Sequence, residues 1–316
     1  MAEKTRKMPR IPFRRLIPYM GLILIVIVFS LITDGKFLTA RNMRIIMTQA
    51  MITMVAAVGT TFVMAHNNLD FSLGGGCALC AVVAFLITGG KNLLLVFICC
   101  LLMGMLCGLT TALIHIKGHI PAFMAGMCIM FIGRGTVDGI ITSNGTVMKL
   151  TADTDAFANI NFYMLVLVLV VLAGCFLFNR TRIGKYQKLI GSNPTAAMLS
   201  GIQVGKYKML AFLISGATLG IASFLTLLRL GSLTATVGQN LEVDVLIALC
   251  LGGMPISGGS ASSIRAAIIG PLSYFMLANG MTLCGVDPHL VYVVKAAVFL
   301  MMTFITIDRS RSRVIV

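Results

Sequence analysis

The chain of 316 residues is too apolar for a soluble protein: 58% of its residues are hydrophobic and 11% are charged. Its mean hydropathy is +0.97, and a soluble chain of this length could not bury so much apolar surface. If a helical span takes about 20 residues, ten spans use roughly 200 residues and leave the rest for connections. The composition therefore excludes a soluble protein and indicates a polytopic helical membrane protein.

A window of about 19 residues moved along the chain finds ten apolar segments, each a candidate for a helical span. They cover residues 16–33, 45–65, 71–89, 92–114, 121–141, 161–178, 209–228, 242–258, 264–283 and 289–307. Only His66–Asp70 separates the second from the third, and a Gly/Ser run separates the eighth from the ninth, so broken or re-entrant helices are expected there. The predicted fold class is all-α, with about ten transmembrane helices.

The basic residues lie mainly on one side of these ten segments. The formal net charge is +15, from 25 Lys and Arg against 10 Asp and Glu. With the N-terminus in the cytoplasm, seventeen Lys and Arg fall on the inner side, six on the outer side, and Arg134 and Lys295 within segments. This is the positive-inside pattern, with both termini cytoplasmic. The excess charge thus indicates an orientation in the membrane, and no nucleic-acid partner is expected.

The same distribution divides the chain into three parts. Residues 1–15 form a basic cytoplasmic tail that resembles the start of a signal peptide, but no small-residue cleavage site precedes Thr33, so the first segment is expected to be retained. Residues 16–307 form one transmembrane domain, and residues 308–316 form a basic cytoplasmic C-terminal tail.

Motifs for catalysis or cofactor binding are missing from the sequence. The nine cysteines all lie in apolar stretches, and the CxxC of Cys77 and Cys80 has no second pair or nearby His, so it indicates packing and not redox or zinc chemistry. No phosphate-binding loop, dinucleotide-binding motif or Ser/His/Asp set occurs. We therefore expect no metal, no cofactor and no enzymatic activity; any ATP used must be hydrolysed by another chain.

One inner connection, residues 179–208, is long, polar and rich in Lys and Arg. Within it Asn193 has the position of a helix N-cap, Pro194 that of the first helical residue and Gly201 that of the stop. The pattern predicts a short helix on the inner face of the membrane. It could be a loop bound to anionic lipid, or a docking helix for a cytoplasmic partner, since Ala196 and Ala197 are small enough to enter a groove.

Several ionisable residues fall at membrane depth, where each costs about 2.5 to 3.5 kcal/mol on insertion scales. They are Asp70, Arg134, Asp138, Glu242, Asp244 and Lys295. Arg134 and Asp138 are four residues apart on one helix, so they could neutralise each other or meet cargo. Lys295 stands alone in an apolar segment, so its partner could be any of the carboxylates, and it could serve packing or transport.

Five stretches follow one another in an informative order. They are Leu69–Gly74; His115–Phe123 with Gly133–Gly135; Arg182–Ile202; Leu241–Gly259; and Asn279–Gly280 with Val293–Lys295. In this order they resemble the motifs G-I-D-L-S-V-G, K-x-x-I-P-P-F-I with A-R-G, G-x-N-x-x-A-A-x-x-S-G-I and E-L-D-x-I-A-x-x-x-L-G-G-x-x-x-x-G-G. These motifs are those of the permease subunit of bacterial ATP-binding-cassette (ABC) importers of the ribose, xylose and galactose type. The resemblance runs from Gly59 to Arg309.

The resemblance implies a multi-pass subunit of the bacterial inner membrane that moves a monosaccharide or related solute. The partners it implies are a second permease subunit, the same or different, two cytoplasmic ATP-binding subunits on the 179–208 loops, an extracytoplasmic solute-binding protein, and the surrounding lipid. It assigns the coupling helix to Gly191, Asn193, Ala196, Ala197 and Gly201. It also places Asp70, Arg134, Asn279 and Lys295 near the translocation pathway.

The sequence departs from the family pattern at Asn68, where Gly is usual, and at Ser260 and Ala261, where a basic residue and Gly are usual. Two other classes stay open. An ion-coupled secondary transporter would use Asp70 and Lys295 as a relay, and an ABC permease could carry nucleosides or branched-chain amino acids. A membrane enzyme is disfavoured because no cluster of acids, histidines or nucleophiles converges.

Overall fold

The computed structural model describes residues 16–144, 147–150, 157 and 159–306. The expected basic tails, 1–15 and 308–316, lie outside the described residues. The described chain is mostly helical, with twelve α-helices and one short 3-10 turn, η2 (Lys36–Leu38). The α-helices are α1 (Ile17–Ile32), α2 (Ala40–Ala65), α3 (Leu73–Thr88), α4 (Leu93–Lys117), α5 (Ala122–Asn144), α6 (Ile160–Asn179), α7 (Arg182–Ser192), α8 (Pro194–Leu199), α9 (Val204–Leu230), α10 (Leu241–Leu251), α11 (Ala266–Leu283) and α12 (Pro288–Thr306).

Each of the ten predicted segments contains one of these helices, and α7 and α8 lie in the 179–208 loop. Six described helices are long and apolar enough to cross a membrane: α2, α4, α5, α6, α9 and α11. Helices α1 and α3 and residues 288–304 of α12 are shorter apolar helices. The protein is therefore a helical multi-pass membrane protein, and the count of ten spans stays a prediction.

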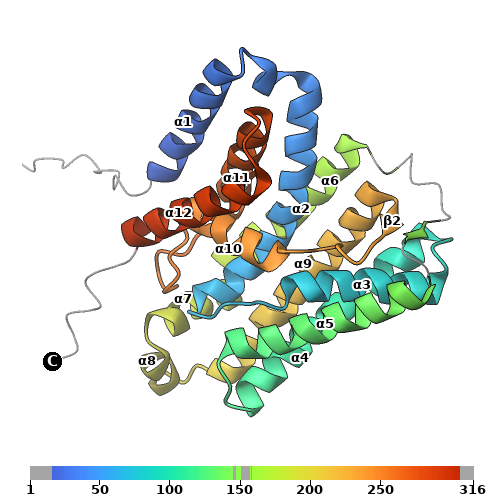
Figure 1. The fold of residues 1–316 in the computed structure, drawn as a ribbon. Helices are drawn as coiled ribbons and strands as arrows, with labels where there is room; N and C mark the ends of the chain where they lie inside the picture. The colour runs from blue at the N-terminus through green and yellow to red at the C-terminus, as the bar shows by residue number, and fades with distance from the viewer. Residues whose placement is uncertain (1–15, 145–146, 151–156, 158, 307–316) are drawn as a thin grey trace, which may run out of the picture.

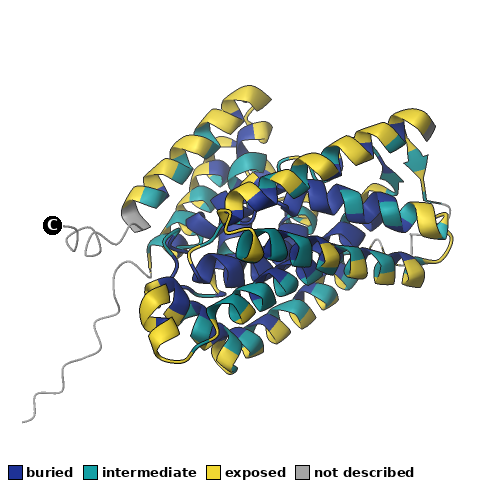
Figure 2. Ribbon diagram, turned by 90° about the horizontal axis from the view of Figure 1, so that it is seen from below, coloured by how far each residue is buried: buried dark blue, intermediate teal, exposed yellow. Residues whose placement is uncertain are grey.

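Helices α2 and α9 form the centre of the molecule, and the other long helices surround them (Figures 1 and 2). The most apolar window of α2 is 78% buried, whereas that of α6 is 22% buried. Helices α4 and α9 pack backbone to backbone, because a Cβ on Gly104 would overlap the carbonyl oxygen of Gly216 and the reverse also holds. Small residues at such crossings are the usual means of close helix packing in membranes.

Helices α3 and α10 begin well inside the membrane-spanning part of the molecule. A Cβ on Gly75, in the first turn of α3, would overlap the main chain of Met130, near the middle of α5. Helix α10 has 11 residues, about 16 Å, which is roughly half of a bilayer's hydrocarbon core. The prediction of broken helices thus agrees with the structure at α3 and at α10.

The segment before α10, residues 231–240, starts near the end of α5 and runs back along it to its middle. Strands β1 (Met148–Lys149) and β2 (Ser232–Leu233) pair just beyond the ends of α5 and α9. Only a few residues later, the carbonyls of Val237 and Gly238 accept hydrogen bonds from Arg134, the thirteenth of the 23 residues of α5. We call residues 234–240 the re-entrant loop.

The predicted extent of the eighth span, 242–258, is wrong at its C-terminal end. Helix α10 ends at Leu251, and no helix follows until Ala266. The cause is a glycine pair: a Cβ on Gly252 would overlap the main chain of Ala266, and Gly253 has a φ of 85°. Glycine is the residue that adopts this left-handed conformation without strain.

Candidate functional site

The 179–208 loop folds into two short helices, α7 and α8, which lie at one end of the molecule (Figure 1). The predicted capping is confirmed. The Asn193 side chain accepts a hydrogen bond from the Ala196 amide at 3.0 Å, and Pro194 begins α8. Gly201 has a φ of 78°, just after the C-cap of α8 at Ser200. Local sequence alone therefore shapes this helix and its turn.

Helix α7 is held against the spans on three sides. A Cβ on Gly191 would overlap the carbonyl oxygen of Ala65 at the end of α2. The Gln187 side chain is fully buried and donates to the carbonyl of Tyr207 in α9 at 2.5 Å. The Lys188 ammonium lies 4.4 Å from the centre of the Phe178 ring in α6, and burial lowers the pKa of Lys188. Movement of α7 must therefore displace α2, α6 or α9.

Helix α8 presents an apolar tip to the surroundings. Ala197 is buried, whereas Ala196 is exposed, so these two alanines face opposite ways. Met198 and Leu199 are 62% and 82% exposed. The family motif did not identify Met198 and Leu199 as candidate docking residues, because it leaves both positions variable. Their position at the end of a capped helix is the sequence signal that could have identified them.

Asp70 lies in the connection between α2 and α3 and is almost completely buried. Its Oδ1 accepts from the amide and hydroxyl of Ser72, at 3.0 and 2.5 Å, and its Oδ2 accepts from the Ser215 hydroxyl in α9 at 2.9 Å. A carboxylate with three donors at depth fixes a connection that otherwise has no helix to satisfy its polar groups.

Arg134 fastens the re-entrant loop to α5. Its Nη1 and Nη2 donate to the carbonyls of Val237 and Gly238 at 2.7 and 2.6 Å. The suggested pairing with Asp138 is not formed: Asp138 is exposed, and among the described residues none is paired with it. The nearby Glu242 is buried against Gly74 at the start of α3, and its Oε2 has no hydrogen-bond partner in the described part of the chain.

Lys295 pairs with Asp244, which answers the question of its partner. Its Nζ lies 3.9 Å from Oδ1 of Asp244 and 4.3 Å from the centre of the Tyr274 ring. The Tyr274 hydroxyl donates to the same Asp244 oxygen. The cluster joins α10, α11 and α12. The Oδ1 of Asn279, also in α11, is buried with no hydrogen-bond partner among the described residues.

Three of the four predicted pathway residues therefore have separate hydrogen-bond or ion-pair partners. Asp70 holds the connection before α3, Arg134 the re-entrant loop, and Lys295 the first turn of α10. Arg134 holds the segment that leads into α10, and Lys295 pairs with Asp244 in the first turn of α10 itself. Within the described ranges, no group of three or more His, Cys, Asp or Glu could hold a metal ion.

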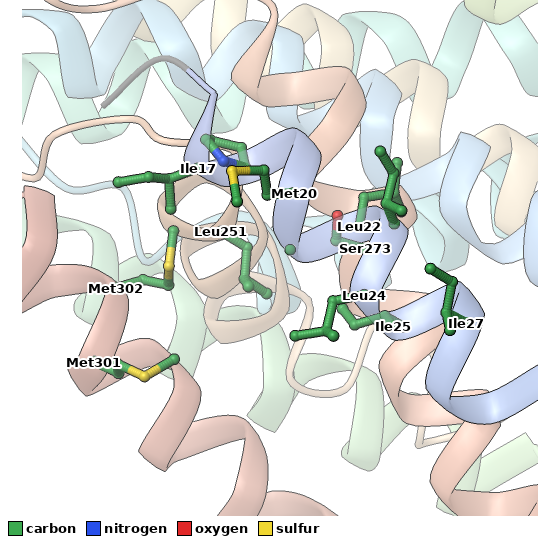
Figure 3. Close-up of a pocket in the computed structure, with 13 residues that line it drawn as sticks. Ile17, Met20, Leu22, Leu24, Ile25, Ile27, Leu251, Ser273, Met301 and Met302 are labelled. Carbon is green, nitrogen blue, oxygen red and sulfur yellow. The ribbon is translucent and has the colours of Figure 1, made fainter. Parts of the chain in front are cut away.

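An apolar cavity of about 460 Å³ lies between α1 and the helices α10, α11 and α12 (Figure 3). Side chains of α1 form one wall, and Leu251, Ser273, Met301 and Met302 form the other. Ser273 supplies the only side-chain hydroxyl of this lining. A sugar needs several hydrogen-bond partners, so the cavity suits a hydrocarbon chain and not a sugar.

Comparison with known proteins identifies the chain's relatives. A family model described as branched-chain amino acid transport system / permease component matches residues 42–303. The ribose import permease protein RbsC of Escherichia coli (strain K12) is 31% identical over 90% of each chain. The xylose transport system permease protein XylH of Haemophilus influenzae is 27% identical, over 93% of this chain and 96% of its own.

The fructose import permease protein FrcC of Rhizobium meliloti is 27% identical, over 88% of this chain and 81% of its own. No solved structure matches the chain significantly. The family match spans most of the sequence, from the first turn of α2 into α12. The chain therefore belongs to the family of branched-chain amino acid transport system permease components.

Proposed function

We propose that the chain is the membrane-spanning translocation subunit of an ABC importer of the bacterial inner membrane. It moves a monosaccharide or a related small polar solute, and a partner subunit hydrolyses the ATP. The observation that carries the proposal is similarity along nearly the whole chain to permeases named for the import of ribose, xylose and fructose.

The 179–208 loop supplies the coupling to the partner in this proposal. Asn193 and Gly201 shape α8, and Gly191 and Ala197 seat the loop on the spans. Ala196 faces outward beside the apolar tip of Met198 and Leu199. A cytoplasmic ATP-binding subunit that grips this tip would move α7, and α7 contacts the end of α2 and the glycine run after α10. Two-state motion of a packed element is the usual way to carry such a signal.

Asp70, Arg134, Asn279 and Lys295 remain the proposed pathway region. Asp70, Arg134 and Lys295 form hydrogen bonds or an ion pair within the protein, which favours a role in shaping the wall of the translocation pathway. Asn279, with a carbonyl oxygen that has no partner in the described chain, is the one best suited to accept a hydrogen bond from a sugar hydroxyl.

Transport assays in vesicles test the proposal. The chain is co-expressed with the ATP-binding subunits and solute-binding protein of its own gene cluster, and uptake of labelled ribose, xylose and fructose is measured with and without ATP. ATP-dependent uptake is expected. Uptake driven by a proton or sodium gradient without the partners would favour an ion-coupled secondary transporter instead.

The docking step is tested by Leu199→Ser. The substitution is expected to abolish copurification of the ATP-binding subunits and sugar-stimulated ATP hydrolysis. Leu283→Ser is the matched control, because Leu283 is also exposed but lies at the last residue of α11. Equal copurification with both variants would contradict docking at α8.

The family description supports a second candidate cargo, branched-chain amino acids. The same vesicles, supplied with labelled leucine or with a nucleoside in place of sugar, distinguish these cargoes. Saturable ATP-dependent uptake of leucine and none of any sugar would replace the sugar assignment.

A further inference from the structure

The apolar cavity beside α1 has no role in the proposed transport of a polar solute. Helix α1 touches the helices behind it near both of its ends. A Cβ on Gly253 would approach the Pro18 ring to 2.9 Å, and a Cβ on Gly280 would overlap the Phe29 ring. Between these two contacts, nothing lies within 4 Å of a Cβ added to Gly21, which lines the cavity. Helix α1 therefore bridges the cavity between two points of contact.

The walls of this cavity offer hydrocarbon and no free side-chain donor. Every lining residue except Ser273 is aliphatic, methionine, glycine or proline. The Ser273 hydroxyl donates to the carbonyl of Ile269 at 2.9 Å, so its hydrogen is already used. Water does not fill an apolar cavity of this kind, and an empty one loses the contacts that its walls would otherwise make. The cavity therefore suits an apolar occupant.

The cavity is open to the lipid around the protein, because Leu24 and Met301, on its two walls, are both exposed (Figure 3). Its length also fits a lipid chain. The eleven residues from Pro18 to Phe29 advance about 16 Å along α1. Half of a bilayer's hydrocarbon core is about 15 Å thick. The space that α1 bridges thus has the length of one acyl chain from one leaflet.

An unpaired positive charge lies at the end of the cavity where α1 begins. Arg265 is exposed, and no carboxylate in the described part of the chain pairs with it. The residue after it, Ala266, contacts Gly252, and the neighbouring Gly253 contacts Pro18 on the cavity wall. This end of the molecule is the predicted cytoplasmic end, where basic residues attract anionic headgroups.

The sequence adds positive charge at the same end of the cavity. The first turns of α1 and the last turns of α12 line it. Arg14 and Arg15 come shortly before α1 in the sequence, and Arg309, Arg311 and Arg313 follow α12. The charge around the opening therefore favours a lipid with a negative headgroup over a zwitterionic one.

We propose that the cavity binds an acyl chain of one anionic phospholipid of the inner leaflet, with the lipid phosphate at Arg265. The chain fills the space under α1 and joins α1 to α10, α11 and α12. Leu251, on the cavity wall, is the last residue of α10 and directly precedes the glycine bend at Gly252 and Gly253. The lipid therefore also supports that bend. The inference does not depend on which solute the protein carries.

Tryptophan fluorescence tests the site, because the sequence contains no tryptophan. Met302→Trp places a reporter on the cavity wall, and Phe176→Trp places one on the exposed face of α6 as the control. Each full-length variant is reconstituted in phosphatidylcholine vesicles, and brominated phosphatidylglycerol or brominated phosphatidylcholine then replaces part of the lipid. Phosphatidylglycerol should quench Met302→Trp at the lower share of lipid. The two lipids should quench Phe176→Trp equally.

Substitutions in the Met302→Trp chain separate the two parts of the site. Gly21→Phe fills the cavity and should abolish the preference for phosphatidylglycerol, whereas Leu172→Phe, on the exposed face of α6, should keep it. Arg265→Gln should raise the share of phosphatidylglycerol needed for half-quenching about fivefold. Arg180→Gln removes another exposed arginine of the predicted inner side and should leave that share unchanged.

A second measurement needs no reporter. Mass spectra of the intact, otherwise unaltered chain, purified from phosphatidylglycerol-containing membranes, should show one bound phosphatidylglycerol that Gly21→Phe lacks and Leu172→Phe keeps. Equal quenching of Met302→Trp by the two lipids, or equal lipid retention by Gly21→Phe and Leu172→Phe, overturns the proposal. Quenching by neither lipid also overturns it and indicates that a protein segment fills the cavity. Each of these results leaves the transport assignment untouched, since solute uptake is measured separately.

Discussion

Charged side chains in and between the spans are held by groups that lie far away in the sequence. Asp70 accepts from Ser215, and Arg134 donates to the main chain of the re-entrant loop. Sequence reasoning found the charged residues, because ionisable groups are rare in apolar segments. It could not find their partners, since a main-chain carbonyl has no signature in sequence. The pairing of Arg134 with Asp138, one of two alternatives, relied on local spacing alone.

The ion pair of Lys295 and Asp244 gives a prediction at this scale. Lys295→Met and Asp244→Asn each leave one charge at depth without its partner, so each should lower stability by about 3 kcal/mol. The double variant should recover part of the loss, with a coupling energy of about 1 kcal/mol or more. Thermal unfolding of the four purified proteins in detergent measures the cycle. Additive losses would show that the two groups do not interact.

Gly191 gives a second residue-scale prediction. Gly191→Ala should unseat α7, because the added methyl group overlaps the carbonyl of Ala65, and should cost more than about 2 kcal/mol. Gly205→Ala, at the start of α9, meets only a side-chain carbon of Ile116 at 3.5 Å and should be neutral or slightly stabilising. Unfolding temperatures and the ATPase coupling of both variants measure the difference, and a harmless Gly191→Ala would contradict the seating of α7.

At the scale of elements, hydropathy located the helices and glycine geometry decided where they end. Each predicted segment holds a helix, and the capping pattern around Asn193 located α8. Hydropathy placed the end of the eighth span at 258, because a window of about 19 residues averages Gly252–Gly259 with the apolar residues of α10 before it. The bend there depends on the contact of Gly252 with Ala266, which only the tertiary structure supplies.

The cap of α8 is testable by itself. Asn193→Ala removes the bond to the Ala196 amide and should cost the helix about 1 kcal/mol. Amide hydrogen exchange across 194–200 should become faster, and ATPase coupling should fall. Ser200→Ala removes an exposed hydroxyl bond to the Ala196 carbonyl and should change exchange less. Asn193→Asp keeps the acceptor and should preserve the helix.

At the scale of the whole molecule, hydropathy predicts ten spans, and the positive charges predict that both ends of the chain lie in the cytoplasm. Epitope tags at residues 1 and 316 should be cut by protease only in inverted vesicles, and Cys284, at the end of α11, should react with an impermeant thiol reagent only in right-side-out cells. Labelling of the two ends from opposite sides would require an odd number of spans and a new assignment of the inner loops.

The length of α10 has a consequence for how the protein is made. With 11 residues it is too short to stop in the translocon by itself. The segment from 231 to 265 must therefore enter the bilayer together with α9 and α11, and its re-entrant loop can settle only after Arg134 is in place. Insertion of the second half of the chain thus depends on the finished first half, and ribosome-bound chains that end just after α10 should remain sensitive to protease from outside.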